Sequence, residues 1–106
     1  MFETRERAAE AKFVHERDAA FQAHAHRDRM FGRWAARLMG LRGPAIENYA
    51  RSLMFSDVES VDDEALLARV RSDLAERDVA GPRAAEDRLR RKLERLNALA
   101  RADLGG

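Results

Sequence analysis

Apolar residues recur at helical spacing in four stretches of the chain, and polar or turn-forming residues separate these stretches. The clearest stripe lies in the second half of residues 4–39, where apolar positions follow the i, i+3, i+4, i+7 spacing of one helix face. Upstream, the same stripe is thinner. This pattern predicts a long first helix that is well anchored only in its second half. The anchoring residues are Phe31, Trp34, Ala35 and Leu38.

Three shorter amphipathic segments follow, and each predicts one helix with a single buried face. Their expected buried residues are Ile46, Tyr49, Ala50, Leu53 and Met54 in the second helix, Leu66, Leu67, Val70 and Leu74 in the third, and Leu89, Leu93, Leu96, Leu99 and Ala100 in the fourth. β-branched residues are scarce and no alternating strand pattern occurs. We therefore expect an all-α protein, a small four-helix bundle with a long first helix.

Start and stop signals place the connections between these helices. Thr4 is the expected N-cap of the first helix and Gly40 its stop, and Pro44 suits the first position of the second helix. Residues 56–63 form an acidic connector, and Asp62 or Asp63 is expected to cap the third helix. Residues 78–81 end the third helix, and Gly81-Pro82 is expected to start the fourth as Gly43-Pro44 starts the second.

Gly32 interrupts the strongest apolar stripe, although glycine costs about 1 kcal/mol relative to alanine inside a helix. A close approach of a neighbouring helix is the preferred explanation, and a hinge is the alternative. Trp34 and Tyr49 are expected to be core residues on facing helices rather than a platform for a ligand.

Charge is abundant but balanced, since 37% of residues are charged and the net charge is +1. This balance argues against a dedicated nucleic-acid-binding protein. The charge is also unevenly distributed: residues 1–40 carry eight basic and six acidic side chains, residues 41–80 five and nine, and residues 81–106 seven and four. We expect the acidic middle to pair with the basic flanks and so to stabilise the bundle.

Cysteine is absent, and no apolar run approaches the 18 or so residues of a membrane span. The first residues alternate charges of both signs, unlike a secretory signal. These features favour a soluble cytoplasmic protein.

Candidate chemistry is sparse. His24 and His26 point to nearly opposite sides of a helix and His15 lies more than two turns from His24, so we expect surface histidines and no metal site. The acidic residues of the connector lack the central glycine of a calcium loop. Arg88, Arg90, Arg91, Lys92 and Arg95 alternate with apolar residues, so we expect a solvated helix face rather than a nucleic-acid site. No activated nucleophile or phosphate-binding loop is evident, so we expect no enzymatic activity and no cofactor.

The opening segment, FETRERAAEAKF, places Phe2 and Phe13 on a thin apolar line among charges. From the residues alone, two interpretations stay open: a frayed helix end, or an arm that folds into a partner's groove.

Several motifs together resemble the ATPase inhibitor subunit zeta family of bacterial F-type ATP synthases. The resemblance covers nearly the whole chain in order, although no motif is specific alone. It rests on F-E-x-R-E-R-x-x-E-x-K-F from Phe2 to Phe13, RDRMFGRWAARLMGL from Arg27 to Leu41, Tyr49-Ala50, Asp57-Val58-Glu59, Asp62-Asp63-Glu64, and Leu89-Arg90-Arg91-Lys92-Leu93. The histidines at 24 and 26 and Val61, where a glycine is common, depart from the family pattern.

The resemblance implies a protein that inhibits ATP hydrolysis by the catalytic head of the synthase, formed by its alpha, beta and gamma subunits. Residues 1–19 would be a mobile inhibitory arm, disordered or loosely helical when free, and residues 20–104 the bundle that holds it. The arm would enter a catalytic αβ interface as a helix and block rotation in the hydrolytic direction. Its contacting residues would be Phe2, Arg5, Glu6, Arg7, Glu10, Lys12 and Phe13.

The same resemblance implies a protein that is monomeric when free and that reaches the cytoplasmic face of the inner membrane only through the synthase. The alternative is a small helical adaptor or a nucleotide-responsive regulatory module with a different partner. Histidines at 24 and 26 also suggest inhibition that depends on pH near neutrality.

Overall fold

The protein is described by a computed structural model that covers the backbone of residues 2–57 and 62–103, with side chains from residue 17 onward within these ranges. Within these ranges, four α-helices follow one another: α1 (Phe2–Leu38), α2 (Pro44–Asp57), α3 (Glu64–Glu76) and α4 (Glu86–Asp103). A short 3₁₀ helix, η1 (Gly81–Ala84), lies between α3 and α4, and no strand occurs among these residues. The all-α prediction is confirmed.

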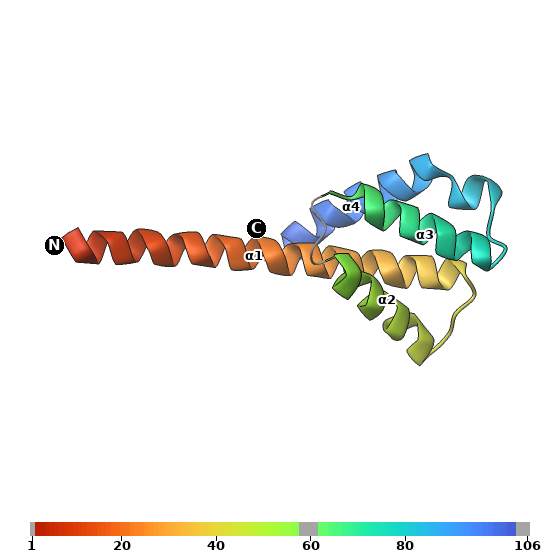
Figure 1. The fold of residues 1–106 in the computed structure, drawn as a ribbon, viewed down its shortest axis with the longest axis horizontal. Helices are drawn as coiled ribbons and strands as arrows, with labels where there is room; N and C mark the ends of the chain where they lie inside the picture. The colour runs from red at the N-terminus through yellow and green to blue at the C-terminus, as the bar shows by residue number, and fades with distance from the viewer. Residues whose placement is uncertain (1, 58–61, 104–106) are drawn as a thin grey trace.

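Helix α1 is the axis of the molecule. The three shorter helices gather around its C-terminal half, while its N-terminal half extends away from them (Figure 1). A 37-residue helix is about 55 Å long at 1.5 Å per residue, which explains why the molecule measures 63 × 28 × 23 Å.

One apolar core joins the C-terminal half of α1 to the other three helices. Its residues are Phe31, Ala35 and Met39 from α1, Leu53 from α2, Leu66, Leu67, Val70 and Leu74 from α3, and Leu89, Leu93 and Leu96 from α4. Most of the predicted buried faces are therefore confirmed. Leu99 is an exception, because 47% of it is exposed near the end of α4. Trp34 and Tyr49 lie half-buried at the margin of the core, and Ile46 and Met54, predicted as buried, are only half-buried.

Gly32 allows α1 and α2 to approach closely, as the sequence predicted. A Cβ atom at this position would lie 2.6 Å from Ala50 Cα and 3.1 Å from Ala50 Cβ. No side chain can occupy that space unless the two helices separate.

Two of the predicted helix boundaries agree with the structure. The backbone of Gly40 is left-handed, with φ of +83°, and the Leu41 N–H donates to the Ala36 carbonyl, so α1 ends in a Schellman-type turn. Helix α2 starts at Pro44.

Other predicted boundaries are wrong. Helix α1 starts at Phe2, so Thr4 is not its N-cap, and α2 continues through Ser56 and Asp57, which the sequence assigned to the connector. Gly81-Pro82 starts η1 rather than α4, because the extended backbone of Ala85 interrupts the helical path before Glu86. The connector position Val61 lies outside the described residues.

The two aspartates expected to cap α3 have different roles: Asp62 accepts a hydrogen bond from the first turn, and Asp63 binds α1 instead. The Glu64 N–H donates to Asp62 Oδ1 at 3.0 Å. Asp63 occupies the N-cap position but makes no side-chain cap bond, because its carboxylate accepts hydrogen bonds from Arg27 of α1. The start of α3 is thereby fastened to α1.

The basic flanks pair with the acidic middle of the chain, as predicted. Arg33 Nε donates to Glu47 at 2.7 Å, and Arg90 donates to both Glu64 oxygens at 2.8 and 3.1 Å. These pairs join α1 to α2 and α4 to α3. They hold the pKa values of Glu47 and Glu64 below the usual range, chiefly through the arginine hydrogen bonds.

Candidate functional site

The N-terminal part of α1 carries the predicted contact set: Phe2, Arg5, Glu6, Arg7, Glu10, Lys12 and Phe13. The structure places these positions on one continuous helix, and their side chains lie outside the described part of the chain. Phe2 and Phe13 are 11 residues apart, which is about three turns and about 16 Å along the helix axis. Both positions therefore lie on the same side of α1, as the sequence predicted.

Among the residues that the structure describes, no other helix runs beside this part of α1 (Figure 1). The residues from Arg17 to Gln22 are all exposed, and Phe21 has 56% of its surface in solvent. The described apolar core begins only at Phe31, with Met30 packed against it. We call the part of α1 up to Gln22 the projecting segment. Its described side chains pack little against the apolar core of the bundle.

A group of polar side chains lies where α1 enters the bundle, and we call it the polar junction. It consists of His24, Arg27, Asp28, Asp57 and Asp63. Helical spacing places the first three on one face of α1, Asp57 is the last residue of α2, and Asp63 immediately precedes α3. The junction therefore connects three elements at the base of the projecting segment.

Arg27 lies at the centre of the polar junction and is only 5% exposed. Its Nε and Nη2 donate to Asp28 Oδ1 at 3.0 and 2.9 Å, and its guanidinium also donates to both Asp63 oxygens at 3.0 and 3.2 Å. Nη2 also lies 3.5 Å from Asp57 Oδ2. One guanidinium thus compensates several carboxylates that would otherwise be buried with like charge.

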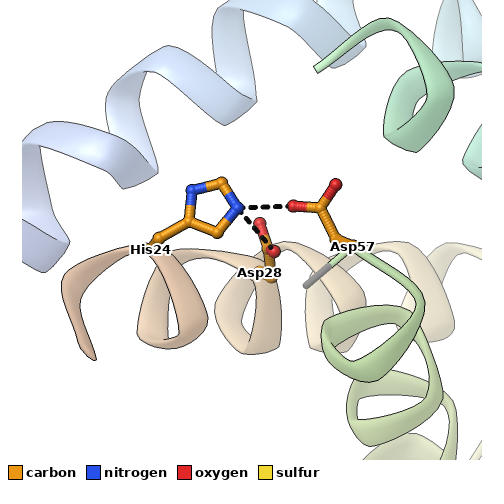
Figure 2. A group of neighbouring side chains, drawn as sticks. All are labelled: His24, Asp28 and Asp57. Carbon is orange, nitrogen blue, oxygen red and sulfur yellow. Dashed lines mark hydrogen bonds and ion pairs between the residues drawn. The ribbon is translucent and has the colours of Figure 1, made fainter. Parts of the chain in front are cut away.

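His24 lies against the two most deeply buried carboxylates of the polar junction. Its Nε2 is 2.6 Å from Asp57 Oδ2 and 3.4 Å from Asp28 Oδ2, as Figure 2 shows. The Asp28 and Asp57 side chains are 1% and 2% exposed, whereas that of His24 is 40% exposed. The imidazole therefore separates a buried acidic pair from solvent.

The electrostatics of Asp28 are unusual. Burial, together with the neighbouring Asp57 carboxyl, raises the pKa of its carboxyl group to about 8 against the opposing effect of Arg27. Asp28 Oδ2 is buried and has no hydrogen-bond partner in the described part of the chain. The polar junction thus contains more carboxyl groups than Arg27 and the hydrogen bonds within the junction can compensate.

The sequence did not reveal this group. The helical spacing of the three histidines predicted surface positions, because this spacing does not show which carboxylates lie near each ring. The carboxylate that approaches His24 comes from 33 residues further along the chain. A partial signal was available, since His24, Arg27 and Asp28 share one helix face, but finding Asp57 requires the crossing of α1 and α2.

His26 pairs differently, although it lies only two residues further along. Its Nε2 is 3.1 Å from Asp103 Oδ2, and 53% of the Asp103 side chain is exposed. This single pair at the end of α4 lies apart from the polar junction and provides a natural comparison for His24.

A second surface feature surrounds Trp34. Its ring stacks on Phe31, with ring centroids 5.7 Å apart, and the cationic groups of Arg88 and Lys92 lie 5.6 and 5.7 Å from the Trp34 centroid. Arg91 and Arg95 complete a basic pocket over this ring. The basic residues of α4 were predicted as a solvated face, but Arg88 and Lys92 are half-buried because they cover Trp34.

Tyr49 also has a specific partner. Its hydroxyl donates to Asp73 Oδ2 at 2.7 Å, which links α2 to α3. Burial and this aspartate both raise the pKa of Tyr49. Tyr49 therefore stays a neutral hydrogen-bond donor and acts as a structural residue.

None of the helices in residues 2–57 and 62–103 combines the length and the apolar character that crossing a bilayer requires. Comparison with family models finds a match to the family described as ATPase inhibitor subunit zeta, over residues 1–103. Comparisons with curated proteins and with solved structures give no match.

Proposed function

The chain belongs to the ATPase inhibitor subunit zeta family, and on this premise we propose that it inhibits ATP hydrolysis by the catalytic head of an F-type ATP synthase. In this proposal residues 1–19 form the inhibitory arm and residues 20–104 the bundle that holds it. The arm enters a catalytic αβ interface as a helix, contacts the alpha, beta and gamma subunits there, and blocks rotation in the hydrolytic direction. The protein acts as a regulator and not as an enzyme.

The observation that carries the proposal is the projection of α1 beyond its bundle (Figure 1). A surface helix normally buries an apolar face against its own domain, yet the residues from Arg17 to Gln22 are exposed. A helical segment without tertiary packing is marginal in water. We therefore propose that the arm is disordered or loosely helical in the free protein and becomes fully helical in the enzyme.

Burial in the enzyme has to offset the ordering of the arm, which costs roughly 1–2 kcal/mol of backbone entropy per residue. Phe2 and Phe13 are the bulky apolar residues of the arm, and their spacing suits two anchors in one groove. We propose Arg5, Glu6, Arg7, Glu10 and Lys12 as the charged contacts that select the register at the rim. In the cell, the free protein would be a cytoplasmic monomer that reaches the inner membrane only through the synthase.

Paired alanine substitutions test the anchors. We expect Phe2→Ala with Phe13→Ala to weaken inhibition of the catalytic head by at least tenfold, because truncating anchor residues typically costs 2 kcal/mol or more. The matched control is Phe21→Ala, which removes an exposed phenylalanine of the same helix outside the contact set. Full inhibition by the doubly substituted chain would refute the assignment of the anchors.

The basic pocket over Trp34 favours a second candidate, a nucleotide-responsive regulatory module with another partner. Four cationic side chains surround an aromatic ring there, an arrangement that suits a polyphosphate with a stacked base. Titration with ATP, followed by Trp34 fluorescence, tests this candidate. A response lost in Lys92→Ala supports it, and an unchanged spectrum at millimolar ATP excludes it.

A further inference from the structure

Three side chains with metal-binding chemistry converge in the polar junction: His24 and Asp28, one turn apart on α1, and Asp57 at the end of α2 (Figure 2). One ligand atom from each lies within 4.8 Å of the other two. Ligands bonded to one cation at about 2.0–2.2 Å lie about 3 to 3.5 Å apart. Small adjustments of these side chains therefore suffice to surround an ion.

The buried Asp28 Oδ2 atom is a second observation that points to a ligand at this place. Its side chain is 1% exposed, and Oδ2 has no hydrogen-bond partner among the described residues. Oδ2 faces the His24 ring, and its ion-pair contact there is the Nε2 atom at 3.4 Å. Native proteins rarely leave a buried carboxylate oxygen without a hydrogen bond, so Oδ2 is suited to accept a group that binds between His24, Asp28 and Asp57.

The charges of the polar junction also favour a cation. The three carboxylates of Asp28, Asp57 and Asp63 surround a single guanidinium, that of Arg27. When the buried Asp28 and Asp57 carboxylates are both ionised, the one guanidinium leaves negative charge between them uncompensated. A divalent ion supplies the positive charge that compensates it.

The ligand types narrow the choice of ion. One imidazole nitrogen and two carboxylate oxygens suit Zn²⁺ and similar divalent transition metals better than Mg²⁺ or Ca²⁺, which prefer oxygen ligands alone. The 40% exposure of the His24 side chain leaves a path for the ion and a position for water as a fourth ligand. Arg27 holds the other oxygen of Asp28 and so orients this carboxylate. Its Nη2 also lies 3.4 Å from His24 Nε2 and 3.5 Å from Asp57 Oδ2, and a bound ion would displace these two longer contacts.

We propose that His24 Nε2, Asp28 Oδ2 and Asp57 Oδ2 form a site for a divalent transition metal ion of the Zn²⁺ class. The ion would fasten the end of α2 to α1 at the base of the projecting segment. This proposal goes beyond inhibition and does not depend on it, because metal binding is measured on the isolated chain without the synthase.

The test is titration of the chelator-treated full chain with Zn²⁺ at pH 7.5, by calorimetry and by thermal unfolding. We expect one ion per chain with a Kd in the micromolar range or tighter, and a higher unfolding temperature with Zn²⁺. His24→Gln is expected to weaken binding at least tenfold. The matched control, His26→Gln, removes a histidine that pairs with a single exposed carboxylate, and its Kd is expected to stay within twofold of the unsubstituted chain.

A second measurement needs no substitution and therefore does not depend on how the variants fold. Imidazole ¹⁵N spectra of the unsubstituted chain should show Zn²⁺-dependent shifts at His24 Nε2. Absence of stoichiometric Zn²⁺ binding would overturn the proposal. A proton shared between the Asp28 and Asp57 carboxyl groups, rather than a metal ion, would then reduce the negative charge of the polar junction. Binding that survives His24→Gln, or ¹⁵N shifts confined to His15 or His26, would also overturn it by placing the ion elsewhere.

Discussion

At the scale of single residues, Arg27 determines whether the polar junction can exist. It is a buried cation among Asp28, Asp57 and Asp63, and its hydrogen bonds reach three segments of the chain. A buried ion pair of this kind contributes less to stability than its contacts suggest, because desolvation opposes the attraction. Removal of one partner is much more costly, since the remaining charges stay buried without compensation.

Arg27→Ala is therefore expected to destabilise the metal-free protein by about 3–5 kcal/mol, the usual cost of leaving buried charges uncompensated. The matched control is Arg29→Ala on the same helix. Arg29 forms a 3.9 Å pair with Glu47 in which both side chains are more than 40% exposed, so its loss should cost less than about 1 kcal/mol. Urea unfolding of both variants gives the comparison, and equal small losses would contradict the central role of Arg27.

The pairing of charged blocks was predictable from the sequence, but the individual partners were not. Residues 41–80 are acidic between basic flanks, and Arg33–Glu47 and Arg90–Glu64 follow that pattern. By contrast, His24–Asp57 depends on the position at which α2 ends and crosses α1. No local pattern in the sequence carries this information.

At the scale of elements, the close contact between α1 and α2 depends on a missing side chain. Gly32 faces the backbone of Ala50, and Leu53 Cδ2 would lie 3.4 Å from an added Cβ. The same contact positions Asp57, one turn beyond Leu53 on α2, against the polar junction. Helix packing and the polar site are therefore coupled through Gly32.

Gly32→Ala tests this coupling, because two effects act in opposite directions. Helix propensity favours alanine by about 1 kcal/mol. Overpacking against the Ala50 backbone costs about 1–3 kcal/mol, and a clash at 2.6 Å with main chain belongs at the upper end of this range. We expect a net loss of about 1–2 kcal/mol in the free energy of unfolding, measured with urea.

The control for this experiment is Ala20→Gly, at an exposed position of the same helix. It isolates the propensity term and should cost no more than about 1 kcal/mol. A more stable Gly32→Ala protein would contradict the close approach and would favour the hinge interpretation.

The sequence correctly predicted the helix boundaries that are determined by residues within a single turn. Gly40 and Pro44 act within their own turns, and the structure confirms both. The predicted start of α4 at Gly81-Pro82 was wrong, because residues 81–84 form a 3₁₀ helix and the backbone is extended at Ala85. Leu99 fitted the apolar period of α4 but is exposed near the end of that helix.

At the scale of the whole molecule, a long helix projects from a small bundle (Figure 1). The polar junction lies where this helix enters the bundle. The all-α fold followed from the spacing of apolar residues, since four amphipathic stripes with short connectors favour a bundle. The function of the projecting segment could not be derived in this way. A thin apolar line fits both a frayed end and a binding arm, and it is the projection of α1 together with membership of the inhibitor family that favours the arm.

The central claim is that residues 1–19 inhibit while the bundle holds them. Its most direct test is titration of ATP hydrolysis by the catalytic head from the same organism, with the full chain and with a chain lacking residues 1–18. Circular dichroism and thermal unfolding first establish that the shortened chain keeps the bundle, which we expect because the described core begins at Phe31. The account predicts inhibition by the full chain and none by the folded, shortened chain; equal inhibition by both would contradict it.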